Sequence, residues 1–160
     1  MMPKSDSATS FQIRRVLDAP REKVFAAWTQ KALLEQWMCR DVPTQRAEYV
    51  ELDVRPSGRY VIEIQLPRGE KYRGEGIFRE VKSPEKLVFT WFWKKLPEKK
   101  GEAPVQERES LVTVELFDRG SSTELVLTHE LISSVKERDE TERGWKGCFD
   151  VLAAALESRK

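Results

Sequence analysis

The spacing of hydrophobic and polar positions divides the chain into two regimes, of which the first is a strand followed by short helices. Apolar residues alternate over 11–17, which predicts a first strand. Helical spacing follows from Pro20 to Trp28, since a proline in the first turn of a helix loses no needed hydrogen bond. Thr29 is placed to cap a second short helix. Its apolar stripe consists of Leu33, Leu34, Trp37 and Met38.

The second regime begins at residue 47, where the period changes to two. Six runs with this period are separated by turn-forming segments such as 55–58 and 118–121, and short links of this kind join antiparallel neighbours. The expected strands are 47–54, 59–66, 71–81, 86–93, 111–118 and 123–131. We expect the charged segment 94–109 to be a mobile hairpin loop, with a flap over a binding site as the alternative.

The last element is an amphipathic helix that begins near Ser134. Ser134 and Glu137 have the spacing of a capping box. Gly144 and Gly147 would each cost about 1 kcal/mol in a helix interior relative to alanine. They therefore indicate either close packing or room beside the helix, and we expect close packing. The apolar face consists of Trp145, Cys148, Phe149, Leu152 and Leu156.

These elements predict an α+β fold, in which a curved antiparallel sheet wraps around the long C-terminal helix and two short helices follow the first strand. A chain of 160 residues can bury a core of its own without metal or disulfide help. We expect residues 1–9 to form a disordered tail and residues 10–158 to form a single domain. Gly74 and Gly76 lie in a strand pattern, where they are expected to allow close packing against the helix.

Composition and charge narrow the classes of partner. The chain has 28 Lys and Arg against 27 Asp and Glu, so no overall field attracts nucleic acid or an anionic membrane. Cys39 and Cys148 have no neighbouring cysteine, which fits neither a disulfide framework nor a zinc site. No apolar run approaches the roughly 18 residues of a membrane helix, and the N-terminus lacks the apolar core of a signal peptide. We expect a cytoplasmic protein.

Several stretches resemble the signatures of a known family. LDAPREKVF at 17–25, with AWT at 27–29, is similar to the opening signature of one branch of the START-like or polyketide-cyclase-like (SRPBCC) superfamily. This branch is named after the activator of the heat-shock chaperone ATPase. LDVRPSGRY at 52–60 and LVFTW at 87–91 resemble its second and third signatures. Gly144-Trp145 followed by Leu152 resembles its C-terminal helix.

The resemblance extends over nearly the whole chain and implies the helix-grip fold. It also implies a cavity between sheet and helix, in a family whose members include sequestering proteins for small molecules and co-chaperone domains of the stress response. The chain departs from the family at 36–39, where QWMC replaces the usual Trp-Trp-x-Pro. This departure alters one end of the expected cavity. The motifs are mostly signatures of the fold, so they fix the fold better than the function.

Alternation along the strands points a set of aromatic residues toward the helix. Trp91 and Trp93 are the strongest candidates for ligand contact, because a flat ring stacks on a planar apolar ligand while its indole N–H fixes the orientation. Tyr60 and His129 share this inward face. Core packing is the alternative role for all of them. Three further residues would close the opposite side of the cavity: Trp37, Trp145 and Phe149.

His129 is the only histidine, and three roles are open to it. It could donate to a ligand oxygen, act as a base near neutral pH, or serve as a satisfied structural donor. The sequence contains no nucleophile elbow, no phosphate-binding glycine loop and no cluster of metal ligands. We therefore expect neither a metal nor another cofactor.

The sequence thus favours a non-catalytic protein that binds a small hydrophobic or aromatic molecule for carriage, sequestration or sensing. A protein-interaction domain, for a chaperone or another partner, is the first alternative. It would present an exposed apolar patch on the sheet, formed by Val61, Val88 and Phe92. A cyclase-like or hydratase-like enzyme is the second alternative, with His129 or an inward carboxylate as acid or base.

Overall fold

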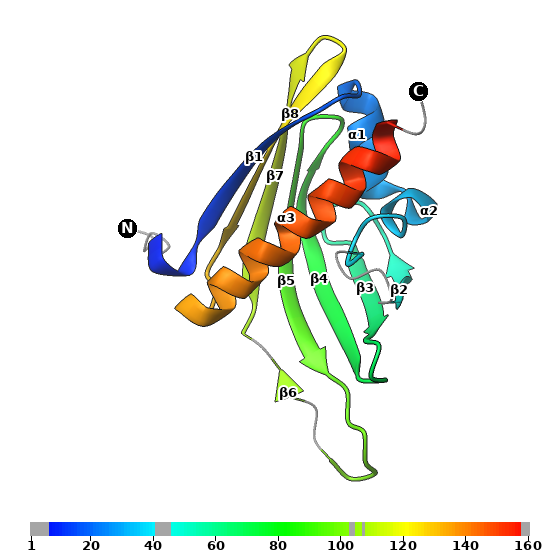
Figure 1. The fold of residues 1–160 in the computed structure, drawn as a ribbon, viewed down its shortest axis with the longest axis vertical. Helices are drawn as coiled ribbons and strands as arrows, with labels where there is room; N and C mark the ends of the chain where they lie inside the picture. Colours follow the sequence, from blue (N-terminus) through cyan, green and yellow to red (C-terminus); the bar gives the residue numbers. More distant parts are fainter. Residues whose placement is uncertain (1–6, 41–45, 103–104, 107, 158–160) are drawn as a thin grey trace.

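An antiparallel sheet dominates the computed structural model, which describes residues 7–40, 46–102, 105–106 and 108–157. Its strands lie in the order β1-β8-β7-β5-β4-β3-β2, and β6 pairs with the end of β5. Strands β1 and β2 lie at opposite edges of the sheet, and α1 and α2 follow β1 in the chain before β2 begins (Figure 1). The strands are β1 (Phe11–Leu17), β2 (Arg46–Leu52), β3 (Arg59–Gln65), β4 (Lys71–Lys82), β5 (Lys86–Lys95), β6 (Val105–Gln106), β7 (Ser110–Arg119) and β8 (Ser122–Glu130).

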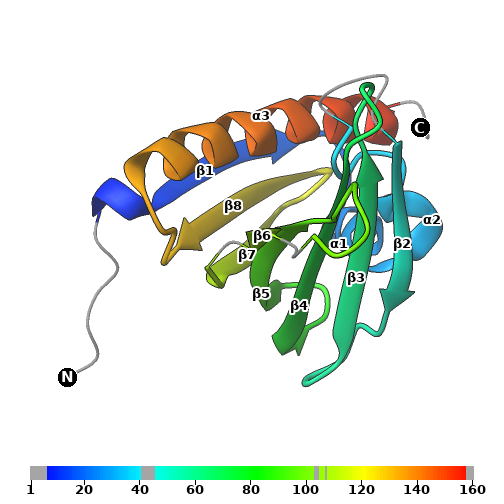
Figure 2. The same cartoon turned by 90° about the horizontal axis from the view of Figure 1, so that it is seen from below.

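The sheet curves around one long helix. Figure 2 shows α3 running across the concave side, with the strands bending away beneath it. Two register shifts, at Tyr49/Glu51 in β2 and at Phe78/Glu80 in β4, mark bulges that help a sheet to bend. The predicted α+β helix-grip fold is therefore confirmed. The helices are α1 (Arg21–Thr29), α2 (Lys31–Leu34), α3 (Val135–Glu157) and the short 3-10 helix η1 (Ser7–Thr9).

Packing of α3 against the sheet forms the core. All five residues of its predicted apolar face are buried, and Leu152 is fully so. The polar side of the helix is tied to β1, because Arg15 donates to Asp150 across 2.5 Å. This ion pair accounts for Arg15, which stands between Ile13 and Leu17 where the alternation of the first strand calls for an apolar residue. At the start of the helix the N–H of Glu137 donates to Ser134 Oγ across 3.2 Å, which is one half of the predicted capping box.

The second short helix is briefer than the predicted stripe. It ends at Leu34, and Trp37 and Met38 follow in turns, where the N–H of Met38 donates to the Leu34 carbonyl across 2.9 Å. All three side chains are nevertheless buried. The apolar spacing therefore identified residues that enter the core, although the backbone leaves the helix between them.

Two predicted irregular segments contain ordered backbone. Residues 1–6 of the expected tail lie outside the described residues, whereas Ser7–Thr9 form η1 and the Thr9 carbonyl accepts a 3.1 Å hydrogen bond from the N–H of Ile132. In the expected loop 94–109, β5 continues to Lys95 and pairs with β6, which extends the hairpin. Residues 103–104 and 107 of this loop lie outside the described residues.

The glycines pack differently from the prediction. A Cβ atom on Gly76 would stand 1.9 Å from the Thr90 carbonyl oxygen, and one on Gly74 would stand 2.8 Å from the Trp93 ring. Close packing is therefore confirmed for both, but the contacts come from the neighbouring strand and not from the helix. Gly144 is the reverse case, because a Cβ atom there would meet nothing within 4 Å. The expected close packing at Gly144 is wrong, and the helix has room beside it.

We predict that Leu152→Ala lowers the free energy of unfolding by about 2–5 kcal/mol, because it removes a fully buried side chain from the contact between α3 and the sheet. Urea denaturation measures this loss. Val135→Ala is the matched control, since Val135 belongs to the same helix but is 53% exposed, and it should cost less than about 0.5 kcal/mol. Equal losses for the two variants would contradict the assigned packing.

Candidate functional site

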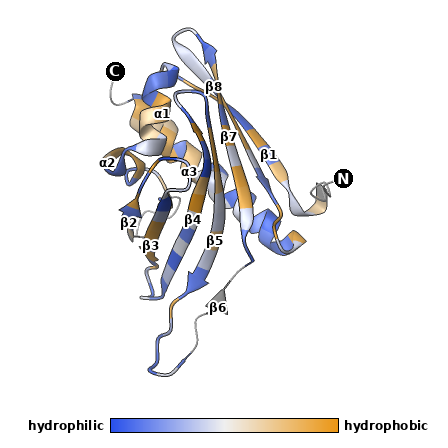
Figure 3. Cartoon of the chain, turned by 180° about the vertical axis from the view of Figure 1, so that it is seen from behind, coloured by the Kyte–Doolittle hydropathy of each residue, from blue (hydrophilic) through white to orange (hydrophobic). Residues whose placement is uncertain are grey.

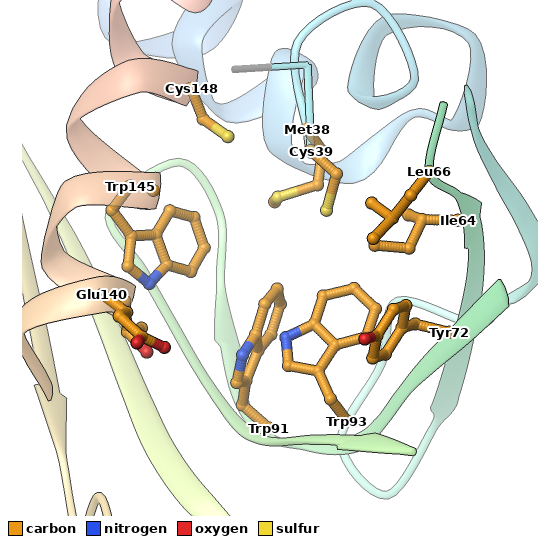
Figure 4. A pocket seen from close by; sticks show the side chains of 12 residues that line it. Met38, Cys39, Ile64, Leu66, Tyr72, Trp91, Trp93, Glu140, Trp145 and Cys148 are labelled. Carbon is orange, nitrogen blue, oxygen red and sulfur yellow. The ribbon is translucent and has the colours of Figure 1, made fainter. Parts of the chain in front are cut away.

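A cavity of about 410 Å³ opens between the N-terminal half of α3 and the sheet. Trp91 and Trp93 of β5 form its floor, and Tyr72 of β4 stands beside them (Figure 4). Ile64 and Leu66 close the side at the end of β3. The volume lies within the range of about 300–1,000 Å³ that is typical of sites for small ligands.

Helix α3 and the turn after α2 supply the other walls. Met38 and Cys39 point their sulfur atoms into the cavity from the segment in which the sequence departs from the family pattern. From α3 come Glu140, Gly144 and Cys148, which are four residues apart and so lie along one side of the helix. Gly144 lies between the other two without a side chain. The space that a larger residue would fill is part of the cavity.

Contacts between aromatic rings hold Trp91 and Trp93, the tryptophan wall at the floor of the cavity, in place. The Trp91 ring meets Trp93 edge-on, with centroids 5.5 Å apart and planes at 89°. On its other side Trp91 lies 5.2 Å from Trp145, with the planes tilted by 41°. Such arrangements are favoured by the quadrupoles of the rings. Trp91 is largely buried by these neighbours, whereas Trp93 is half-buried and more open to the cavity.

His129 bridges the sheet and α3 behind this wall. The indole N–H of Trp145 donates to His129 Nδ1 across 3.1 Å, which requires that Nδ1 carries no proton. The proton of the neutral ring is therefore on Nε2, which lies 2.7 Å from Ser110 Oγ and donates to it. The Ser110 hydroxyl in turn donates to the Trp91 carbonyl across 2.9 Å. Each side-chain polar atom in this series of hydrogen bonds has a partner. The series fixes the Trp145 ring and the backbone at Trp91, which belong to two walls of the cavity.

The same hydrogen bonds leave His129 unable to act as an acid or a base. Burial lowers its pKa from the usual value to about 3, so the ring stays neutral at physiological pH. Its Nε2 already carries a proton and cannot take one from Ser110. The ring is also buried and lies outside the large cavity, next to a void of about 10 Å³. Of the three roles that the sequence left open, the geometry supports the satisfied structural donor.

The other expected residues are divided between wall and core. Trp91, Trp93 and Trp145 line the cavity. Tyr60 lies deeper, beside an apolar void of about 20 Å³; its hydroxyl donates to the Thr90 carbonyl across 2.5 Å, and burial raises its pKa well above the ordinary value. The remaining two are fully buried core residues that do not line the large cavity: Trp37, whose indole N–H donates to the Ala27 carbonyl across 2.9 Å, and Phe149.

Sequence reasoning missed several wall residues, including three that simple spacing could have found. Tyr72 pairs with Ile64 and therefore shares the inward face of the sheet. Glu140 stands one helical turn before Gly144, and Thr141 one turn before Trp145. For Glu140 and Thr141, the signal in the sequence was that the inward face of α3 extends toward the N-terminus of the helix. It was overlooked because that turn is polar.

The expected apolar patch on the outer face of the sheet is absent from the described residues. Val61 is only 5% exposed, and Val88 and Phe92 are half-buried. Val61 faces Glu75 on the next strand, and this carboxylate binds Lys94 across 3.0 Å and Arg59 across 3.1 Å. Burial alone would raise the pKa of Glu75, but the hydrogen bonds from the two cations lower it below the ordinary value. The charged cluster of Glu75, Lys94 and Arg59 thus lies at the place expected for the patch, and alternating bands of hydropathy run along the strands (Figure 3).

Comparison with known proteins identifies the family. Residues 18–157 match the family model described as Activator of Hsp90 ATPase homolog 1-like protein. The chain belongs to this family. The match includes both short helices, the sheet from β2 to β8 and the whole of α3. The family resemblance drawn from the sequence motifs is therefore confirmed. No curated protein matches the chain.

Solved structures of bacterial proteins share the fold of this family member. A solution structure from Arthrobacter aurescens has a TM-score of 0.80 at 23% identity, covering 97% of this chain and 91% of that one. A crystal structure from Chromobacterium violaceum has a TM-score of 0.79 at 22% identity, covering 93% and 97%. The AHSA1 protein from Silicibacter pomeroyi has a TM-score of 0.78 at 23% identity, covering 94% and 99%. At 22–23% identity, the similarity to these structures shows a shared fold and nothing about function.

The possible metal ligands and the helices of the described residues bear on the class of site. No group of three or more His, Cys, Asp or Glu side chains within them is arranged to hold a metal ion. Within the same residues, no helix is both long and apolar enough to cross a bilayer. The cavity of about 410 Å³ has the size and the largely apolar lining of a small-molecule site.

The lowered pKa of His129 predicts a pH dependence of stability. The unfolded chain protonates this ring near pH 6.5 and the folded protein only near pH 3, so the unfolded state binds more protons between these values. The contribution of His129 is complete above about pH 6.5 and is lost as the pH falls toward 3, by about 1.4 kcal/mol per pH unit. Urea unfolding of the native protein and of His129→Gln should show a difference that shrinks on acidification.

A pH-independent difference between these two proteins would contradict the assignment. Nitrogen NMR of the native ring gives a second measurement that does not depend on the folding of the variant. It should find Nδ1 without a proton and Nε2 with one, down to about pH 4.

Proposed function

We propose that this protein binds a small, planar hydrophobic molecule in the cavity between α3 and β3–β5, and that it does so without catalysing a reaction. The observation that carries the proposal is the open space beside Gly144, which faces a wall of tryptophans. A helix interior disfavours glycine by about 1 kcal/mol relative to alanine, and no close contact here requires one. Retaining space at this cost supports a role for the cavity.

The chemistry of the lining supports a binder of flat, apolar molecules. Burying apolar area yields roughly 25 cal/mol per Å², and three indoles with Tyr72 offer such area on several sides. Neither Trp91 nor Trp93 has a hydrogen-bond acceptor for its indole N–H among the described residues. These two donors would orient a ligand that carries an acceptor.

The enzymatic alternative has less support from His129, because the hydrogen bonds from Trp145 through His129 to Ser110 use the protons that acid–base catalysis would need. Glu140 is the acid–base group that this alternative retains in the cavity lining. The family description suggests a chaperone partner, but in the outer patch expected for such a partner Val61 is buried and Val88 and Phe92 are half-buried. We place the binding in the cytoplasm, in keeping with Cys39 and Cys148, which form no disulfide.

Gly144→Leu tests the proposal by filling the cavity from the helix side. Because a Cβ atom at this position meets nothing, the leucine should enter the open space, abolish binding and leave the free energy of unfolding unchanged or higher. Acridine at pH 8, where the ring is neutral, is the probe, and isothermal titration calorimetry is the measurement. Ala154→Leu, at an exposed position of the same helix, is the control and should bind like the native protein. Undiminished binding by Gly144→Leu would sink the proposal.

Trp93→Leu should weaken acridine binding by roughly two- to twelvefold, which corresponds to the 0.5–1.5 kcal/mol of a stacked aromatic pair beyond burial. Trp93 suits this test better than Trp91, because it is half-buried and packs less into the core. Titration calorimetry gives the affinity, and urea unfolding shows whether stability is retained. If stability falls while affinity holds, Trp93 is a packing residue and not part of the site.

A further inference from the structure

Glu140 brings a negative charge to the mouth of the cavity. It is the only carboxylate among the described residues that line this space, and none of these residues is Lys, Arg or His. Figure 4 shows its carboxylate beside Trp145, on the α3 side of the opening. None of the described basic side chains lies within ion-pair distance of it. Arg138, two residues earlier, is held by Asp139 across 2.7 Å and by Glu142 across 3.3 Å.

The aromatic walls add to this negative character. Trp91, Trp93, Trp145 and Tyr72 surround the space, and an aromatic ring is electron-rich on its face. A cation placed over such faces is attracted by about 0.5–1 kcal/mol at an exposed site, and by more where water is excluded. The walls therefore favour the same sign of charge on the ligand as Glu140 does.

The arginine just before β7 faces a different space. Arg108 lines the small void beside Ser110 and His129, together with Glu137, and not the large cavity. The cavity beside Gly144 thus has a carboxylate, π faces, sulfur atoms and aliphatic groups in its described lining, and no basic group. A ligand carboxylate or phosphate would find no opposite charge there, whereas an amine would.

From this arrangement we infer that the cavity selects an organic cation: a flat aromatic ring system that carries a protonated amine or a quaternary nitrogen, with its charge directed at Glu140. The inference rests on the proposed function and specifies the ligand class of the same site. Burial of the ring between Trp93 and Trp145 supplies most of the affinity. Glu140 supplies the preference for a positive charge. Its contribution to affinity is small, because it lies at the mouth, where water still reaches the ion pair.

Three probes of similar shape and different charge test the inference: 10-methylacridinium, neutral acridine at pH 8, and anthracene-9-carboxylate. The native protein should bind the cation most tightly and the carboxylate most weakly. Glu140→Gln should weaken binding of the cation by roughly two- to fivefold, the range of an exposed ion pair, and leave acridine unchanged. Added salt should weaken binding of the cation to the native protein and have little effect on Glu140→Gln.

Two further variants separate a local effect from a general one. Glu157→Gln removes the same charge from an exposed position in the last turn of α3, so all three affinities should match those of the native protein. Glu140→Lys reverses the charge at the mouth and should make anthracene-9-carboxylate the tighter ligand of the charged pair. Both positions are exposed, so the variants should fold, which circular dichroism verifies.

The outcomes distinguish this inference from the proposed function. If acridine binds and Gly144→Leu blocks it, but Glu140→Gln leaves the affinity of the cation unchanged, the inference is overturned and the proposed function stands. Tighter binding of the carboxylate than of the cation by the native protein would also overturn it and would point to a basic group such as Arg108. If none of the three probes binds, both proposals fail.

Discussion

The packing of one side of α3 against the concave sheet is the constraint on which the rest of the molecule depends. Residues 140, 144, 148, 152 and 156 are spaced by four and run along the helix. At the C-terminal end of this row, Leu152 and Leu156 are buried and fill the space above the sheet. At the other end, Gly144 leaves that space open and Glu140 reaches solvent. Helix α3 thus contributes to the core at its C-terminal end and to the cavity wall toward its N-terminal end.

The cavity survives because its walls are held independently of any ligand. Trp145 is anchored by its hydrogen bond to His129, and the backbone at Trp91 by its hydrogen bond from Ser110. Without these bonds, the apolar rings would be free to turn into the open space and bury one another. A polar chain whose members are all satisfied rigidifies its surroundings. The only histidine therefore serves the site by positioning its walls, at the cost of being unable to transfer protons there.

The fold was predictable from sequence because periodicity reports which residues are buried, and burial decides the elements. The face of α3 and the inward tryptophans of β5 followed from spacing alone. The division between wall and core did not, because Trp37 and Phe149 have the same apolar character as Trp145 and differ only in what lies beside them. Gly144 illustrates the limit: a glycine in a helix signals either contact or space, and only its neighbours in three dimensions decide which.

The same row of α3 also couples the charge of the site to the stability of the fold. Because Glu140 and Leu152 belong to one rigid helix, the register that buries Leu152 places Glu140 at the mouth. A rotation of α3 that removed the carboxylate from the cavity would also lift the leucines out of the core, at about 2–5 kcal/mol for each buried residue lost. That cost exceeds the contribution of an exposed ion pair several-fold, so the position of the charge is set by hydrophobic packing and not by the ligand. Selectivity at the mouth is in this sense a consequence of the core.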